Sequence, residues 1–229
     1  PEILEHYKDK ISAGVFMDKE DSYVKNFKKG HPKVYKSERA LTLTGERVAK
    51  GEMGVMHGYL PVDQLKHASK SYGVTINQYL VGTFVYAIYK NYLKCQPSKY
   101  PIRCCVPVNL RPYYNSHTMK NFFAMVFATF QPEREDYTFE EVLEIVAKDL
   151  KEQITPENLD NIMSYNVSNE KKWILRAVPL VLKNFVLKQV YGMSAKATSA
   201  TVTNIGNIEL KEPYQQYIDN FTAILSMSK

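Results

Sequence analysis

Residues 75–110 have the sequence TINQYLVGTFVYAIYKNYLKCQPSKYPIRCCVPVNL, and this helix followed by a strand decides the fold class. Thr75 and Gln78 form a capping box, in which the threonine caps the helix backbone and the glutamine reaches back to the cap. The helix predicted from Ile76 to Leu93 is apolar on most of its sides, which is typical of a helix packed inside a domain. Its polar residues and tyrosines argue against a membrane-spanning segment of the same length. A strand is predicted over residues 102–110, because that run is dense in β-branched residues.

Helices and strands alternate on both sides of this pair. Prolines in a first turn and a second capping box predict further helices over residues 61–73, 138–153, from 155 onward and 171–192, the last interrupted by Pro179. Apolar alternation and β-branched or aromatic runs predict further strands over residues 40–48, 52–59, 122–130, 200–204, 207–210 and 217–225. The predicted class is therefore α/β, a two-layer sandwich in which helices flank a mixed β-sheet.

Composition and charge limit how many units the chain can form and which kinds of partner it can bind. The 229 residues are interpreted as one unit, with an irregular lead-in over residues 1–39 and an α/β core over residues 40–229. The net charge of +6 is modest and the positive residues are scattered, so no nucleic-acid partner is expected. Cys95, Cys104 and Cys105 lack metal-ligand spacing, and reduced thiols of this kind predict a cytoplasmic protein with no metal site.

Several short motifs occur in a characteristic order along the chain. They are Leu60-Pro61, Tyr72-Gly73-Val74-Thr75-Ile76-Asn77, Val106-Pro107-Val108-Asn109-Leu110-Arg111-Pro112, Thr118-Met119-Lys120-Asn121-Phe122-Phe123 and Thr203-Asn204-Ile205-Gly206. With this order and spacing, residues 55–225 resemble the second half of the condensation-domain-like acyltransferases. That superfamily includes the peptide-synthetase condensation domains, the alcohol acetyltransferases and the chloramphenicol acetyltransferase fold. The alcohol-acetyltransferase-like branch fits better, because an Asp-Phe-Gly-Trp-Gly loop is not found.

The resemblance implies that the chain is one of two similar lobes that meet around a tunnel. It would be the C-terminal lobe of an enzyme that moves an acyl group, with acetyl as the expectation, from a CoA thioester to an alcohol or amine. Acyl-CoA would be a co-substrate and no cofactor would be tightly bound. The implied partners are the N-terminal catalytic lobe of the same protein and a small-molecule acceptor.

The histidine motif of the superfamily is missing from this chain. By resemblance, a His-His-x-x-x-Asp-Gly motif supplies the base that takes a proton from the acceptor. The residues four positions after His6, His31, His57, His67 and His117 are Lys10, Tyr35, Pro61, Ser71 and Asn121. None of them is aspartate, so no catalytic residue is assigned and the chain alone is expected to be inactive.

A small set of polar residues could still contribute to the site. By resemblance, Arg111 would support the histidine loop by a bidentate ion pair with the motif aspartate, and the alternative is a solvated residue at a strand end. The expected tunnel-lining residues are Asn109, Asn121, Thr203, Asn204 and Gly206. Their alternative role is hydrogen bonding at turns and strand ends. At Gly206, the missing side chain would permit close approach of another group.

A second class of function remains open, a noncatalytic membrane-surface or partner-binding module. The stretch from Lys171 to Tyr191 carries five basic residues, no acid and many bulky apolar residues. Such a basic segment can lie in a headgroup layer. The competing interpretation is a helix docked on the sheet with its lysines in water. A lobe that exposes its interface could also form a homodimer.

Overall fold

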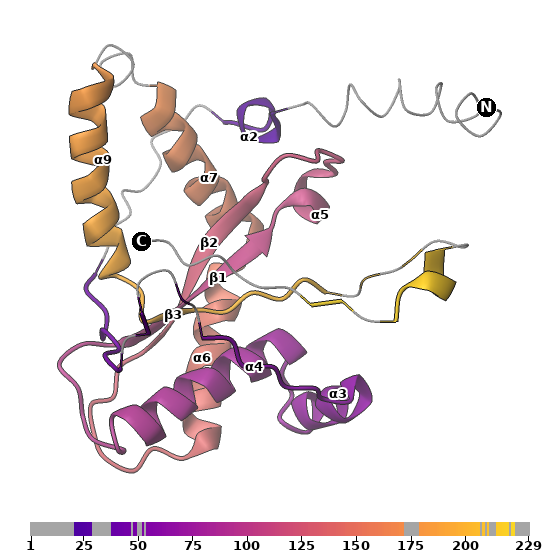
Figure 1. Cartoon of the computed structure of the whole chain (residues 1–229), viewed down its shortest axis with the longest axis vertical. Coiled ribbons are helices and arrows are strands. Elements are labelled where there is room, and N and C mark those ends of the chain that lie inside the picture. The colour runs from indigo at the N-terminus through magenta and orange to yellow at the C-terminus, as the bar shows by residue number, and fades with distance from the viewer. Residues whose placement is uncertain are drawn as a thin grey trace.

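The computed structural model describes residues 21–28, 38–46, 48–49, 52, 54–171, 179–206, 208, 210, 214–219 and 221–222. Its helices are α2 (Ser22–Lys25), α3 (Val62–Ser71), α4 (Ile76–Ala87), α5 (Arg111–Tyr114), α6 (Phe139–Gln153), α7 (Pro156–Lys171) and α9 (Leu180–Ala195), with a π-helical turn η1 (Ile88–Tyr92) and a 3₁₀ turn η2 (Tyr214–Tyr217). Its strands are β1 (Ile102–Asn109), β2 (Phe123–Phe130) and β3 (Ala200–Thr201). Figure 1 shows the strands at the centre of the molecule, with α4 and α6 beside them.

The helix predicted over 76–93 is present as α4 followed by the π-helical turn η1, and it ends at Tyr92. Both halves of the capping box are made: Gln78 N–H donates to Thr75 Oγ1 at 3.2 Å, and Thr75 N–H donates to Gln78 Oε1 at 2.9 Å. Val81, Val85 and Tyr89 lie one turn apart and are fully buried. The Tyr89 hydroxyl donates to a backbone carbonyl, so this aromatic fills the core without leaving an unpaired polar atom.

The sheet is mixed, in the order β2-β1-β3, which confirms the α/β class. β1 pairs antiparallel with β2 from Ile102↔Phe130 to Asn109↔Phe123, and β3 runs parallel to β1. Along β2 the burial alternates, because one face packs on the helices and the other is partly open. The core between this face and the helices is formed by residues of α4, α6, α7, β1 and β2.

The outer edge of β2 is covered by α6. The second predicted capping box is present at Thr138 and Glu141, and α6 runs from there to Gln153 as expected. Its side chains then bond the free backbone groups of the edge strand. Asp149 Oδ2 accepts from Thr129 N–H at 2.7 Å, while Gln153 accepts from Phe127 N–H at 3.1 Å and donates to Phe127 O at 2.7 Å. Unpaired backbone groups at the edge of a sheet allow a further strand to add there. The bonds from α6 occupy these groups on β2 and so prevent such an addition.

Two predicted strands near the start of the core are wrong. The described residues of 40–48 and 52–59 form no strand. Ala40 N–H donates to Lys196 O at 2.8 Å and Leu41 N–H donates to Pro101 O at 2.8 Å, so the two bonds go to different partners rather than to one neighbouring strand. The alternating sequence pattern is present, but a ladder also needs a partner strand.

The predicted strand over 200–204 is shortened to Ala200–Thr201. Val202 N–H still donates to Cys105 O at 2.9 Å. The next donor along β1 would be residue 107, which is proline and has no N–H, so the parallel ladder stops there. The strands predicted over 207–210 and 217–225 are also wrong for the described part of those ranges, where Tyr217 instead ends η2. Their other residues lie outside the described ranges.

The end of the predicted segment 171–192 forms α9, which begins after Pro179 at its N-cap. Residues 172–178 lie outside the described ranges. Among the helices described, none is long and apolar enough to cross a membrane.

The contact between α4 and α6 allows a test of the core. A Cβ atom on Gly82 would lie 2.5 Å from Leu143 Cδ1 and 3.4 Å from Leu143 Cα. Gly82→Val should therefore lower the free energy of unfolding by about 1–2 kcal/mol, because overpacking outweighs the gain in helix propensity. Urea unfolding measures the change. Thr83→Val, at an exposed position on the same helix, should stay within about 0.5 kcal/mol, and equal stability of all three proteins would contradict the tight contact.

Candidate functional site

Arg111 holds the loop between β1 and β2. Its guanidinium donates from Nε to Thr118 O at 2.9 Å, from Nη2 to Lys120 O at 2.8 Å and from Nη1 to Asn109 Oδ1 at 3.1 Å. The side chain is half-buried where β1 ends and α5 begins. A guanidinium has five N–H donors, so these three bonds leave one N–H on each Nη atom. Arg111 is therefore an organised clamp rather than a freely solvated strand-end residue.

Asn109 and Asn121 lie at the same edge of the sheet as Arg111. Asn109 pairs with Phe123 at the last rung between β1 and β2, and Asn121 precedes β2 by two residues. Asn109 Oδ1 accepts from both Arg111 N–H and Arg111 Nη1, each at 3.1 Å. These two donors fix the oxygen side of the amide, so the Nδ2 donors of exposed Asn109 point to the other side.

Thr203, Asn204 and Gly206 follow β3, and all three are exposed. β3 runs parallel to β1, so the chain after it leaves the same end of the sheet that carries Asn109. Asn204 Oδ1 accepts from Gly206 N–H at 2.9 Å, which is a local turn bond. Gly206 has φ +80°, a left-handed conformation that favours glycine. No described atom lies within 4 Å of a Cβ placed on Gly206, so the predicted close approach is not observed within this part of the chain.

A partly buried hydrogen-bonded group joins α5, which follows this edge, to α7. The Tyr114 hydroxyl at the end of α5 donates to Asp160 of α7, and Lys28 makes an ion pair with the same carboxylate. Burial, then the hydrogen bond and charge of Asp160, raise the pKa of Tyr114. For Asp160, burial raises the pKa, but the hydrogen bonds from Lys28 and Tyr114 outweigh it, so the pKa of the carboxyl is lowered. The group therefore ties α5 and α7 to the segment that carries Lys28.

The α2 segment, which the sequence assigned to an irregular lead-in, also builds the site. The Tyr23 hydroxyl donates to Phe123 O at 2.7 Å and accepts from Phe123 N–H at 2.9 Å. Its ring meets Phe122 edge-on, with ring centroids 5.0 Å apart. Ser22 and Ser116 share a hydroxyl hydrogen bond of 2.6 Å. Sequence reasoning missed these contacts, because about 100 residues separate the partners and no local motif marks them.

Arg103 lies near the start of β1, and it has a different role from Arg111. It is 8% exposed, its Nη1 donates to Glu38 O at 3.0 Å, and its guanidinium carbon lies 4.7 Å from the centre of the Phe127 ring. Nε is buried without a hydrogen-bond partner among the described residues. Arg103 therefore anchors the chain near Glu38 to the far end of β1, away from Arg111.

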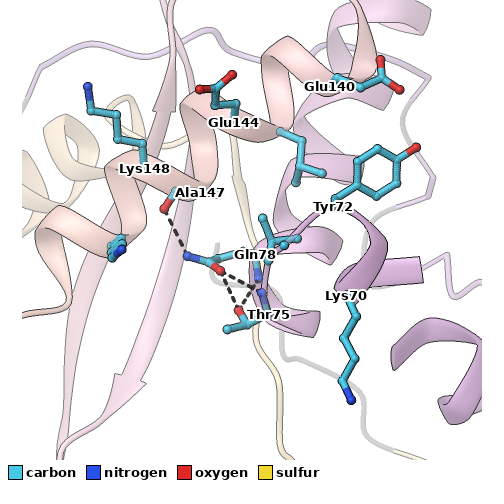
Figure 2. A pocket seen from close by; sticks show the side chains of 12 residues that line it. Lys70, Tyr72, Thr75, Gln78, Glu140, Glu144, Ala147 and Lys148 are labelled. Carbon is cyan, nitrogen blue, oxygen red and sulfur yellow. Dashed lines mark hydrogen bonds between the residues drawn. The ribbon is translucent and has the colours of Figure 1, made fainter. Parts of the chain in front are cut away.

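A groove of about 1030 Å³ lies between the α3–α4 turn and α6 (Figure 2). The Gln78 side chain bridges its walls by donating to Ala147 O at 3.1 Å. The charged lining residues are of both signs; they are Lys70, Lys148, Lys151, Glu140 and Glu144. Burial, followed by the nearby Glu140, raises the pKa of Tyr72. The mixture of charges gives the groove no clear preference for an anion or a cation.

The described residues offer little independent chemistry. Burial raises the pKa of Cys104 to about 12 and that of Cys105 to about 11, so both remain thiols rather than thiolate nucleophiles at neutral pH. Within the same part of the chain, no cluster of three metal-ligating side chains is found. What the edge does offer is hydrogen-bond donors, from Arg111 and from Asn109.

Comparisons of the chain with protein families, with curated proteins and with solved structures find no match. The interpretation of the site therefore depends on the chain's own residues and on the motif resemblance described above. Among the motif residues, Asn109, Arg111 and Asn121 are those that the structure brings together at the junction of β1 and β2.

The Arg111 clamp can be tested by substitution. Arg111→Lys keeps the charge but loses the fork that reaches two carbonyls and one amide, so the free energy of unfolding should fall by about 1–3 kcal/mol. Amide hydrogen exchange in residues 115–121 should also become faster. Lys120→Ala is the matched control, because Arg111 contacts only the backbone carbonyl of Lys120. A variant as stable as the wild type, with unchanged exchange in the loop, would show that the clamp has no structural role.

The anchor at Asp160 predicts a pH dependence of stability. Because the folded state lowers this pKa, the ionised carboxylate stabilises the fold above the unfolded pKa of about 4, and that contribution is lost as pH falls below it. Asp160→Asn should therefore be less stable than the wild type near neutral pH, and the difference should shrink towards pH 3. Urea unfolding at the two pH values measures it. A difference between the two proteins that is the same at both pH values would contradict the anchor.

Proposed function

We propose that this chain is the second lobe of a condensation-domain-like, CoA-dependent acyltransferase. It would transfer an acyl group, expected to be acetyl, from a CoA thioester to an alcohol or amine. The catalytic histidine would come from the other lobe of the protein. The fold of the lobe would be that of one half of the chloramphenicol acetyltransferase type, with the tunnel at the edge where β1 ends and β2 begins.

The observation that carries this proposal is the geometry of Arg111. The residue lies inside a motif of the resemblance, and three of its donors already hold the loop over 115–121. The two remaining N–H groups lie on two different nitrogen atoms, and a bidentate pair with a carboxylate uses donors on two nitrogens. An aspartate on a histidine loop of the opposite lobe would fit this role.

The proposed reaction divides the work between the lobes. A histidine of the other lobe takes the proton as the acceptor oxygen or nitrogen attacks the thioester carbonyl carbon. Negative charge then develops on the carbonyl oxygen, where the Nδ2 donors of Asn109 are suited to stabilise it. The carbon–sulfur bond breaks, the proton passes to the leaving sulfur, and the products are an ester or amide and free CoA.

The test uses the whole protein that contains this chain, incubated with acetyl-CoA and a panel of alcohols and amines. Release of free CoA thiol is measured for the wild type, for Arg111→Met and for the control Lys120→Ala. The wild type should release CoA in an acceptor-dependent manner, and Arg111→Met should lower kcat/KM at least about tenfold through misplacement of the base. Residues 1–229 alone should be inactive. Acyl transfer by this chain alone, or no transfer by the whole protein with any acceptor, would overturn the proposal.

A further inference from the structure

Arg103 carries a positive charge that is almost entirely buried. The side chain is 8% exposed, and its guanidinium carbon lies 4.7 Å from the centre of the Phe127 ring. Nη1 donates to Glu38 O at 3.0 Å, and Nε is buried without a hydrogen-bond partner among the described residues. A buried charge is costly unless an opposite charge compensates it, and no described carboxylate forms an ion pair with this guanidinium.

One end of the Arg103 guanidinium reaches the surface. Nη2 forms no hydrogen bond with a described residue and is not among the buried unpaired atoms, so it is accessible to solvent. The second N–H of Nη1 lies beside the two N–H groups of Nη2. This end of a guanidinium is a fork that can bind two oxygens of one anion.

Two further positive side chains lie close to Arg103. The carbonyl that Arg103 binds belongs to Glu38, and the next residue along the chain is Arg39. The guanidinium carbon of Arg39 lies 4.6 Å from the centre of the Tyr100 ring, and Lys99 Nζ lies 5.7 Å from the same centre. Neither side chain forms an ion pair with a carboxylate in the described part of the chain. Three positive charges that are distant in the sequence therefore gather at the start of β1.

Backbone hydrogen bonds hold this cluster in place. Leu41 N–H donates to Pro101 O and Ala40 N–H donates to Lys196 O, each at 2.8 Å. The segment that carries Arg39 is thereby fixed between the start of β1 and the C-terminal end of α9 (Figure 1). The fold therefore sets the positions of the charges, and an anion can bind without a large and costly rearrangement.

We propose that Arg39, Lys99 and Arg103 form a binding site for a phosphate group. The Arg103 fork binds two phosphate oxygens at the surface, while Arg39 and Lys99 add positive charge from the side of Tyr100. A phosphate monoester carries a charge of about −1.5 to −2 at pH 7, so it suits three cations better than a carboxylate does. The site is separate from the Arg111 clamp, and the inference does not depend on the proposed acyl transfer.

The first experiment is thermal unfolding of the chain with inorganic phosphate, phenyl phosphate or acetate, at one ionic strength set by sodium chloride. A ligand that binds only the folded state raises the Tm, by roughly 3–6 °C at about ten times its Kd. Both phosphates should give a saturable rise, and acetate should bind at least about tenfold more weakly. Tighter binding of phenyl phosphate than of inorganic phosphate would identify a phosphate ester as the ligand, and the reverse order would identify free phosphate. Either order supports the site.

Arg103→Met tests the buried charge directly. The variant should fold, because exchange of a buried charged group for an apolar side chain of similar volume is often neutral for stability, and its phosphate-dependent rise in Tm should be lost. Arg39→Gln combined with Lys99→Gln leaves Arg103 in place and should raise the Kd for phosphate at least about tenfold. Both of these positions are exposed, so the double variant tests the site even if Arg103→Met does not fold.

The matched control is Lys148→Gln combined with Lys151→Gln on α6, which removes the same charge at exposed positions. Its Kd for phosphate should stay within about twofold of the wild type, because charges distant from the site are screened by salt. The proposal would be overturned by an equal rise in Tm with sodium chloride alone, or by acetate binding as tightly as phosphate. An undiminished rise in folded Arg103→Met, or an equal loss in the α6 control, would overturn it as well.

Discussion

The close contact between α4 and α6 is the constraint on which the other packing depends. Gly82 has no side chain, and this allows Leu143 to lie against the α4 backbone. α6 is thereby held where Asp149 and Gln153 reach the edge of β2, and the core of the β1–β2 pair is closed from one side. This helix contact therefore closes the core over one face of the sheet whose far end carries Arg111.

The sequence correctly predicted those helices and strands that are specified by residues close together in the chain. The capping boxes at Thr75 and Thr138 fix helix starts within four residues, and both were found where expected. The strands over 102–110 and 122–130 were also predicted within a residue or two, since each is long and dense in strand-forming residues. The strands predicted over 40–48 and 52–59 were not found, because alternation shows which side chains share a face but does not provide a neighbouring strand to pair with.

The candidate site was only partly predictable for the same reason. Arg111 could be singled out from its motif, but its main partners are backbone carbonyls of Thr118 and Lys120, which no residue type encodes. The Tyr114–Asp160 pair joins residues 46 positions apart, and nothing in either neighbourhood marks the pairing. Even the length of β3 was decided elsewhere, by the absence of an N–H on Pro107.

The bonds from α6 to β2 also determine on which side of the sheet a further strand could pair. A strand that approached from the β2 side would have to break three existing hydrogen bonds before it could form its own. On the opposite side, β3 is two residues long and leaves part of β1 without a neighbouring strand in the described structure. Any additional strand of this sheet is therefore directed to the side of β1 that β3 leaves open. Two polar side chains of α6, those of Asp149 and Gln153, therefore decide on which side this sheet can be extended.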